Sequence, residues 1–198
     1  MNNLFSKLQL LGSELILGSL IAILSVLTAL AGYQASMADS EQTTKNVQGQ
    51  QRLTDANAEY LTANQLIVYD YTLYDGYFTA QPGTEQEEYY RSSFSDTLKA
   101  DMAAGVDLFS DSYYESMYAE ANAMFQEADD LFAKAQEWNK RGDALQLVML
   151  IMALGLAFAA WASLLKEESR MRILFAFFSI AMLVYGLITY LAVPSVAG

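Results

Sequence analysis

The C-terminal third of the chain decides its fold and reads ALQLVMLIMALGLAFAAWASLL (144–165), KEESRMR (166–172) and ILFAFFSIAMLVYGLITYLAV (173–193). Each apolar run is long enough to cross about 30 Å of hydrocarbon as a helix. The short polar segment between the two runs leaves room only for a tight turn. We therefore expect transmembrane helices over 143–165 and 173–193, joined as an antiparallel hairpin by the loop 166–172 and followed by a tail at 194–198.

A third apolar run, at residues 15–33, predicts another transmembrane helix, which follows a short N-terminal segment at residues 1–14. This run has an alternative interpretation. Lys7 before it and the Ala29-Leu-Ala31 triplet near its end are also typical of a cleaved secretory signal. We follow the first interpretation, which gives the chain three membrane spans.

Small residues recur along the helix over 15–33 at alternating spacings of four and three, which places them on one face. Such a face lets a neighbouring backbone approach closely in a membrane, and Ala153, Ala157 and Ala160 offer a partner surface. Ala and Gly are also frequent in membrane helices generally, so the pattern has a second explanation. The predicted helix-packing residues are Gly18, Ala22, Ser25, Ala29 and Gly32.

Charge is concentrated between the first and second membrane spans. The chain has 198 residues and a formal net charge of −12, and residues 34–142 alone hold 19 Asp and Glu against 7 Lys and Arg. We therefore expect a solvated acidic domain there, and its charge argues against nucleic acid as a partner. The absence of Cys and His removes thiolate chemistry, the commonest general base and the commonest transition-metal ligand. We expect no catalytic residue, no cofactor and no metal site, so the chain is predicted not to be an enzyme.

The acidic domain is predicted to be all-α, and its first helix covers residues 34–80. No Pro interrupts the chain between Tyr33 and Pro82, so this helix can continue directly from the first membrane span. Residues at alternating spacings of four and three then predict a heptad seam, as in a coiled coil. The predicted seam consists of Leu53, Asn57, Tyr60, Asn64, Ile67, Tyr71, Tyr74 and Phe78.

Two further helices are predicted in the acidic domain, over 84–104 and 112–142. The first starts at a capping box, in which Thr84 is followed three residues later by Glu87. The second must return antiparallel to the helix over 34–80, which gives a long antiparallel helical stalk between the first and second membrane spans. Its own seam consists of Tyr114, Met117, Ala121, Met124, Ala128, Leu131, Ala135 and Trp138.

Tyrosine is concentrated in the acidic domain, which holds ten of the thirteen tyrosines. Tyrosine gives rigid, amphipathic contact area, so tyrosines off the seam predict a contact surface, whereas those on the seam can simply fill the core. The predicted interface residues are Tyr69, Tyr77, Tyr89, Tyr90 and Tyr113. Nearby carboxylates are also candidate Ca²⁺ ligands, but no EF-hand loop is present, and we favour the interpretation that they form a solvated charged face. These carboxylates are Asp70, Asp75, Asp107 and Asp111.

Basic residues near the spans predict the orientation. The loop 166–172 carries three of them and Lys7 lies on the same side of the membrane, whereas Lys140 and Arg141 adjoin the second span on the other side. The positive-inside rule therefore favours, by a small margin, a cytoplasmic N-terminus and extracytoplasmic residues 34–142. The predicted location is the inner or plasma membrane.

Three stretches carry a resemblance to a known group of proteins: the run from Leu15 to Ala35 leading into Asp39-Ser-Glu41, the segment Asn57-Ala-Glu-Tyr60, and the hairpin around 166–172. In this arrangement the chain resembles uncharacterised prokaryotic membrane proteins with a domain of unknown function, in which one N-terminal and two C-terminal spans flank a helical region. The resemblance implies the fold and no activity. The acidic region is also similar to the periplasmic helical bundle of bacterial chemoreceptors, although no cytoplasmic signalling domain is recognisable in these residues.

The predicted function is that of a non-enzymatic structural or accessory membrane protein. We expect it to self-associate, or to join a membrane complex as a subunit, and to present its acidic, Tyr-rich domain outside the cytoplasm. Its expected partners are the lipid bilayer and copies of itself or other subunits. The alternative is a ligand-sensing or transport-accessory module, which requires a pocket between the helices of the domain.

Overall fold

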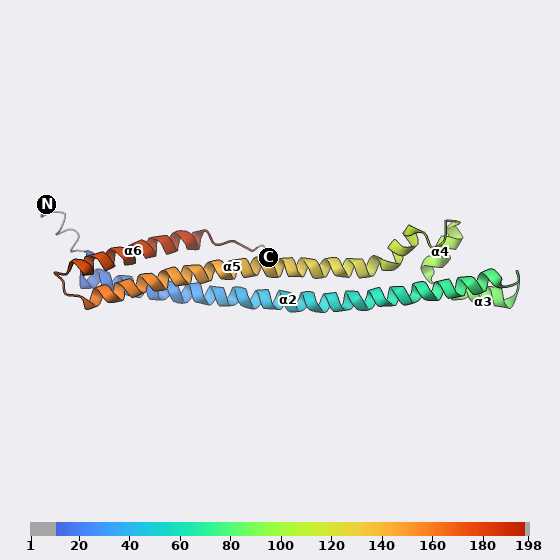
Figure 1. Cartoon of the computed structure of the whole chain (residues 1–198), viewed down its shortest axis with the longest axis horizontal. Helices are drawn as coiled ribbons and strands as arrows, with labels where there is room; N and C mark the ends of the chain where they lie inside the picture. Colours follow the sequence, from blue (N-terminus) through green and yellow to red (C-terminus); the bar gives the residue numbers. More distant parts are fainter. Residues whose placement is uncertain (1–10, 197–198) are drawn as a thin grey trace. The chain divides into compact units, whose positions relative to one another are not determined.

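The computed structural model describes residues 11–196, and over this range the chain is all-α, with five helices and no strand. Three helices, α2, α5 and α6, contain apolar segments long enough to cross a membrane, so the chain is a membrane protein. Lys7, which entered the orientation argument, lies outside the described residues. The helices, labelled in Figure 1, are α2 (Glu14–Thr79), α3 (Glu85–Ser93), α4 (Asp96–Ala104), α5 (Asp111–Leu164) and α6 (Arg170–Leu191).

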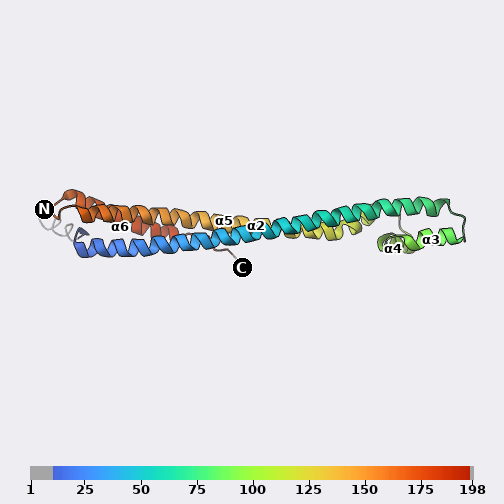
Figure 2. The same ribbon diagram turned by 90° about the horizontal axis from the view of Figure 1, so that it is seen from below.

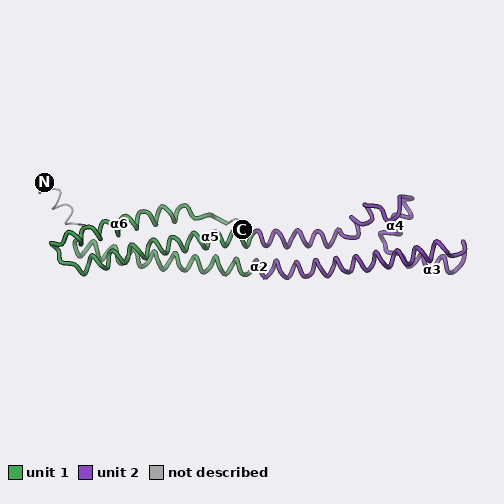
Figure 3. The backbone as a smooth tube through the Cα atoms, viewed as in Figure 1, with its two compact units in different colours: residues 1–45, 134–198 green, residues 46–133 purple. Residues whose placement is uncertain are grey.

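The chain divides into two compact units, coloured separately in Figure 3. Unit 1 combines Met1–Lys45 with Lys134–Gly198, and unit 2 is Asn46–Ala133. The boundary falls inside α2 and inside α5, so each of these long helices contributes to both units. The apolar segments belong to unit 1, and most of the acidic domain belongs to unit 2.

Unit 1 is a three-helix bundle, in which α6 lies beside α5 (Figures 1 and 2). The buried core joins Leu20 and Leu24 of α2 to Val148 and Met152 of α5. Gly155 makes this approach possible, because a Cβ there would lie 3.2 Å from a methyl group of Leu24. Leu24 of α2 therefore packs closely against Gly155 of α5.

A buried arginine joins the polar ends of this bundle. Arg172, at the start of α6, is 4% exposed. Its Nε donates to the carbonyl of Gly12 at 2.7 Å, and its Nη1 donates to the carbonyl of Leu165 at 2.7 Å. One guanidinium thus connects the beginning of α2, the end of α5 and the beginning of α6.

Unit 2 contains an antiparallel pair made of the C-terminal part of α2 and the N-terminal part of α5. Arg52 pairs with Glu127 at 2.5 Å, while further along α2 Tyr60 stacks on Tyr118 at 5.0 Å between ring centroids. The residue numbers of the contacting positions rise along α2 as they fall along α5, so the two helices run antiparallel. Small residues at heptad spacing line the contact between the two helices, and all are buried: Gly49, Ala56 and Ala63 on α2, and Ala121 and Ala128 on α5.

The seam predicted for α2 is displaced from the real one over most of its length, although the predicted residue Ile67 is buried. Asn57 is exposed and donates to the carbonyl of Leu53 in its own helix, and Phe78 is 77% exposed. Small residues at the centre of the seam let the helix backbones approach closely, and the larger predicted residues then lie on its flanks. On α5, by contrast, the predicted seam includes the buried Ala121 and Ala128.

The prediction of one helix over 84–104 is wrong, because the chain leaves the helix at Phe94 (φ −58°, ψ 154°) and starts again at Asp96. Thr84 does cap the first piece, by accepting from the amide of Glu87 at 3.3 Å. Ser95 caps the second piece, by accepting from the amide of Leu98 at 3.1 Å. The break buries the ring of Phe94, which is 2% exposed, so tertiary packing overrides local helix propensity.

Candidate functional site

The most heavily hydrogen-bonded group of unit 2 is a buried carboxylate. Asp70, on α2, is 1% exposed and accepts three hydrogen bonds. The amide of Ser95 donates to Oδ1 at 2.8 Å, while the Ser95 hydroxyl and the Tyr113 hydroxyl donate to Oδ2 at 2.5 Å and 2.7 Å. Asp70 therefore joins α2 to the α3–α4 junction and to α5, and its acceptors are occupied by structural donors.

Aromatic rings surround this carboxylate. Phe109 has a positive φ of 57°, a conformation that costs a bulky residue about 1 kcal/mol or more. Its ring stacks on Tyr71 at 4.1 Å and meets Tyr113 edge-on at 5.2 Å. Burial, and then the hydrogen bond to Asp70, raise the pKa of Tyr113 above its ordinary value. The cluster is thus a packed core in which Tyr113 stays neutral.

The five tyrosines predicted as interface residues separate into two groups. Tyr69 and Tyr89 are 52% and 61% exposed, so they remain available to a partner. Tyr77 and Tyr90 are partly buried around the same core. The prediction for Tyr113 is wrong, because its side chain is fully buried and bonded to Asp70.

An uncharged face of α2 in unit 2 was missed by the sequence interpretation. Eight exposed residues recur there at spacings of four and three, opposite the small residues that contact α5, and none carries a charge. The signal was a second heptad pattern beside the predicted seam. We call these residues the outer face: Val47, Gln51, Thr54, Ala58, Leu61, Gln65, Val68 and Thr72.

The exposed side of α5 in unit 2 has the opposite character. It carries six exposed acidic residues and no basic one between Asp111 and Ala133: Asp111, Glu115, Glu120, Glu127, Asp129 and Asp130. Of these, Glu127 pairs with Arg52 of α2. The two long helices of unit 2 therefore expose one uncharged face and one strongly acidic face.

The small-residue stripe predicted on the first span does not pack inside unit 1. Gly18, Ala22, Ser25 and Ala29 are exposed, and a Cβ added at Gly18 would meet nothing within 4 Å. Only Gly32 is in contact, with the sulfur of Met149 3.0 Å from the position of its Cβ. The prediction that Ala153, Ala157 and Ala160 form the partner surface on α5 is therefore wrong. In the contact between the two helices, α2 supplies leucines and α5 supplies the glycine, Gly155.

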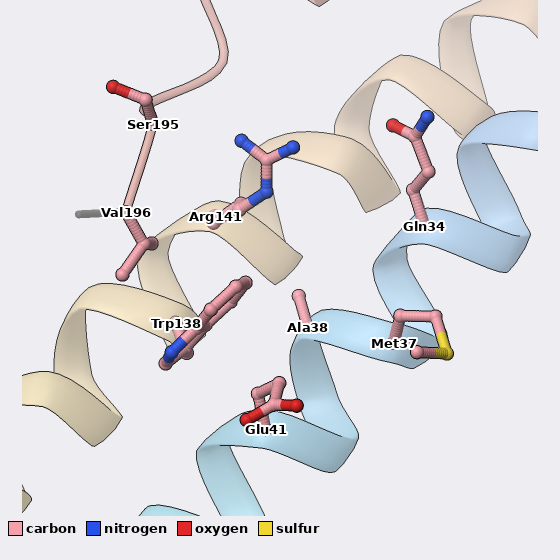
Figure 4. A pocket seen from close by; sticks show the side chains of 8 residues that line it. All are labelled: Gln34, Met37, Ala38, Glu41, Trp138, Arg141, Ser195 and Val196. Carbon is pink, nitrogen blue, oxygen red and sulfur yellow. The ribbon is translucent and has the colours of Figure 1, made fainter. Parts of the chain in front are cut away.

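A pocket of about 490 Å³ lies in unit 1, between α2, α5 and the segment after α6 (Figure 4). Arg141 donates through Nη1 to the carbonyl of Pro194 at 2.6 Å, which holds the C-terminal segment over the pocket. In Figure 4 the indole of Trp138 lies between the guanidinium of Arg141 and the carboxylate of Glu41. We call it the tail pocket, and it is lined by Gln34, Met37, Ala38, Glu41, Trp138, Arg141, Ser195 and Val196.

A smaller pocket in unit 2, of about 360 Å³, adjoins Tyr77, α3 and α4. Its two cations already have acidic neighbours, since Arg91 pairs with Glu88 at 2.8 Å and Lys99 lies 3.9 Å from Asp96. The ligand-sensing alternative requires a pocket between the long helices of the domain, and this pocket is not in that position.

The acidic residues do not assemble into a metal site within residues 11–196, where no group of three or more His, Cys, Asp or Glu side chains is placed to hold an ion. Asp70, one of the four candidate Ca²⁺ ligands, is committed to Ser95 and Tyr113. Comparison with protein-family models, curated proteins and solved structures gives no match for this chain.

Proposed function

We propose that this chain is a non-enzymatic structural or accessory membrane protein that self-associates through the outer face of α2. The outer face carries the proposal, because it is an exposed heptad pattern without charge in a segment of net charge −12. Copies held in one membrane repel each other wherever acidic faces meet. The outer face is where unit 2 of one copy can approach unit 2 of another without that repulsion.

The geometry of association follows from the membrane. Copies inserted with the same orientation pair in parallel, so each heptad position of the outer face meets its own counterpart. Leu61, which is 60% exposed, and Val68, which is 65% exposed, are the largest apolar contacts available. Within the bilayer, the exposed stripe from Gly18 to Ala29 provides a second face for close approach.

Disulfide cross-linking in native membranes tests this proposal directly, because the chain has no cysteine of its own. A Leu61→Cys variant is expected to give a covalent dimer on mild oxidation. The matched control is Asn122→Cys, an exposed position on the acidic side of α5. Equal cross-linking of the two variants, or no cross-linking together with a monomeric particle mass in detergent, would refute the proposal.

We further propose an inner or plasma membrane location, with the loop between α5 and α6 in the cytoplasm and unit 2 outside. Lys166 and Arg170 in or next to that loop, together with the buried charge of Arg172, support this orientation. In intact cells, a membrane-impermeant maleimide should label Ser112→Cys and leave Glu168→Cys unlabelled. The reverse labelling pattern would invert the topology.

A further inference from the structure

The tail pocket lies where the three predicted membrane spans reach the same surface of the bilayer. Its residues follow the first span (15–33), precede the second (143–165) and follow the third (173–193). Lipid headgroups form a layer of roughly 5–8 Å on each side of the hydrocarbon, and a helix rises about 1.5 Å per residue. On this scale Arg141, a few residues before the apolar run, lies in the headgroup layer.

The pocket contains two opposite charges that lie apart from each other. Arg141 supplies one positive charge, and Glu41 supplies one negative charge on the neighbouring helix. Only Nη1 of the guanidinium is engaged with Pro194, and the planar fork of an arginine suits phosphate oxygens. Glu41 beside the indole of Trp138 combines a carboxylate with an aromatic ring, a pairing that suits an ammonium group.

The order of these groups along the helices matches the order of groups in a phospholipid. Arg141 is closer in sequence to the apolar run of α5 than Trp138 is, and Gln34 is closer to that of α2 than Glu41 is. The phosphate group therefore meets Arg141 next to the hydrocarbon, where the side-chain amide of Gln34 is already hydrogen-bonded to the hydroxyl of Tyr190 at 3.0 Å. The ammonium group, which is attached beyond the phosphate, meets Glu41 and Trp138 further out.

We propose that the tail pocket binds the headgroup of a zwitterionic membrane phospholipid, with its phosphodiester on Arg141 and its ammonium between Glu41 and Trp138. The pocket volume of about 490 Å³ accommodates a headgroup. An anionic lipid such as phosphatidylglycerol offers the same phosphate to Arg141 but places a neutral group beside Glu41, which then lacks a cation. The site therefore selects on the positive group as well as on the phosphate.

Native mass spectrometry of the full chain in detergent tests this assignment. Phosphatidylethanolamine and phosphatidylglycerol with identical acyl chains are the probes, and the wild-type chain should bind the former more tightly. Arg141→Gln should weaken phosphatidylethanolamine binding about tenfold or more, because it removes a charge-assisted pair with phosphate. Lys140→Gln, which changes the exposed neighbour outside the pocket, is the matched control and should bind as the wild type does.

A second variant keeps the test independent of the C-terminal segment. Glu41→Gln leaves the bond from Arg141 to Pro194 in place and should reduce the preference for phosphatidylethanolamine over phosphatidylglycerol, whereas Glu137→Gln on the exposed side of α5 should not. The proposal is overturned if both pocket variants bind like their controls, or if phosphatidylglycerol binds the wild type as well as phosphatidylethanolamine. Displacement of the lipid by equimolar glycerophosphoethanolamine would show that the ligand is a soluble headgroup and would also overturn it.

Discussion

Replacing Asp70 with Asn is expected to loosen the α3–α4 region of unit 2 while leaving its side-chain shape almost unchanged. The carboxylate accepts one bond at Oδ1 and two at Oδ2, from Ser95 and Tyr113. An amide has a single acceptor oxygen, so at least one donor must face its NH₂ group. A hydroxyl can accept as well as donate, whereas an N–H can only donate. In the less costly orientation the amide oxygen therefore keeps the Ser95 N–H, and the NH₂ group faces the two hydroxyls, which turn to accept from it.

The size of the effect follows from those three bonds. A hydrogen bond to a buried charge contributes about 1.5–3 kcal/mol and a neutral one about 0.5–1.5 kcal/mol, so each of the three bonds weakens by about 1–1.5 kcal/mol. The three together cost about 3–4.5 kcal/mol of local stability. Because about 1.4 kcal/mol is a factor of ten, opening of this region should become about a hundred to two thousand times more frequent.

Hydrogen exchange with mass spectrometry on the full chain in detergent measures this opening. Peptides from α3 and α4 should exchange faster in Asp70→Asn, while peptides from the apolar segment of α6 should not change. Asp75→Asn is the control, because Asp75 lies on the same helix and is exposed. If Asp70→Asn and Asp75→Asn exchange within about threefold of each other across α3 and α4, the carboxylate does not hold this junction together.

Three further changes test other parts of the structure. The raised pKa of Tyr113 means that its contribution to stability is intact below the ordinary phenol value of 10.0 and is lost as pH rises above it. An absorbance titration at 295 nm should therefore show this phenol ionising only with unfolding, and Tyr113→Phe should reduce the absorbance change of that step by one phenol. Ala128→Leu should destabilise the inner contact of unit 2 by about 1–3 kcal/mol through overpacking, with the exposed Ala123→Leu as control, in thermal unfolding followed by circular dichroism. Arg172→Gln should cost roughly 3 kcal/mol by removing two charged donors to backbone carbonyls, and limited proteolysis of the loop before α6 should speed up compared with Lys166→Gln.

The helices that depend on local signals could be predicted from the sequence. The lack of Pro between Tyr33 and Pro82 is enough for α2 to run without a break to Thr79, and apolar length alone marks the three candidate spans. The break at Phe94 could not be predicted in this way, since no Gly or Pro lies between Thr84 and Ala104. It exists because Phe94 is buried and Ser95 bonds to Asp70, a residue on another helix.

The two candidate sites differ in how far the sequence could reveal them. The outer face is a pattern on one helix, so reading charge as well as hydrophobicity at each heptad position would have found it. The tail pocket joins residues 34–41, 138–141 and 195–196, and no local pattern connects these three segments. Arg141 entered the sequence interpretation only in the orientation argument, and Glu41 only in the acidic charge and the resemblance, because their meeting in one pocket depends on how the helices pack.

The packing inside unit 2 also explains why its contact surface lies on one helix. Small residues such as Ala56 and Ala128 bring α2 and α5 close together, so large side chains are displaced to the flanks and the outward sides of both helices stay exposed. On α5 that outward side is acidic and strongly hydrated, so bringing two copies together there costs both repulsion and desolvation. On α2 it is uncharged and includes Leu61 and Val68, so contact there buries apolar surface at little electrostatic cost. Because the acidic residues are concentrated on α5, the outer face of α2 is left as the surface through which copies of unit 2 can associate without electrostatic repulsion.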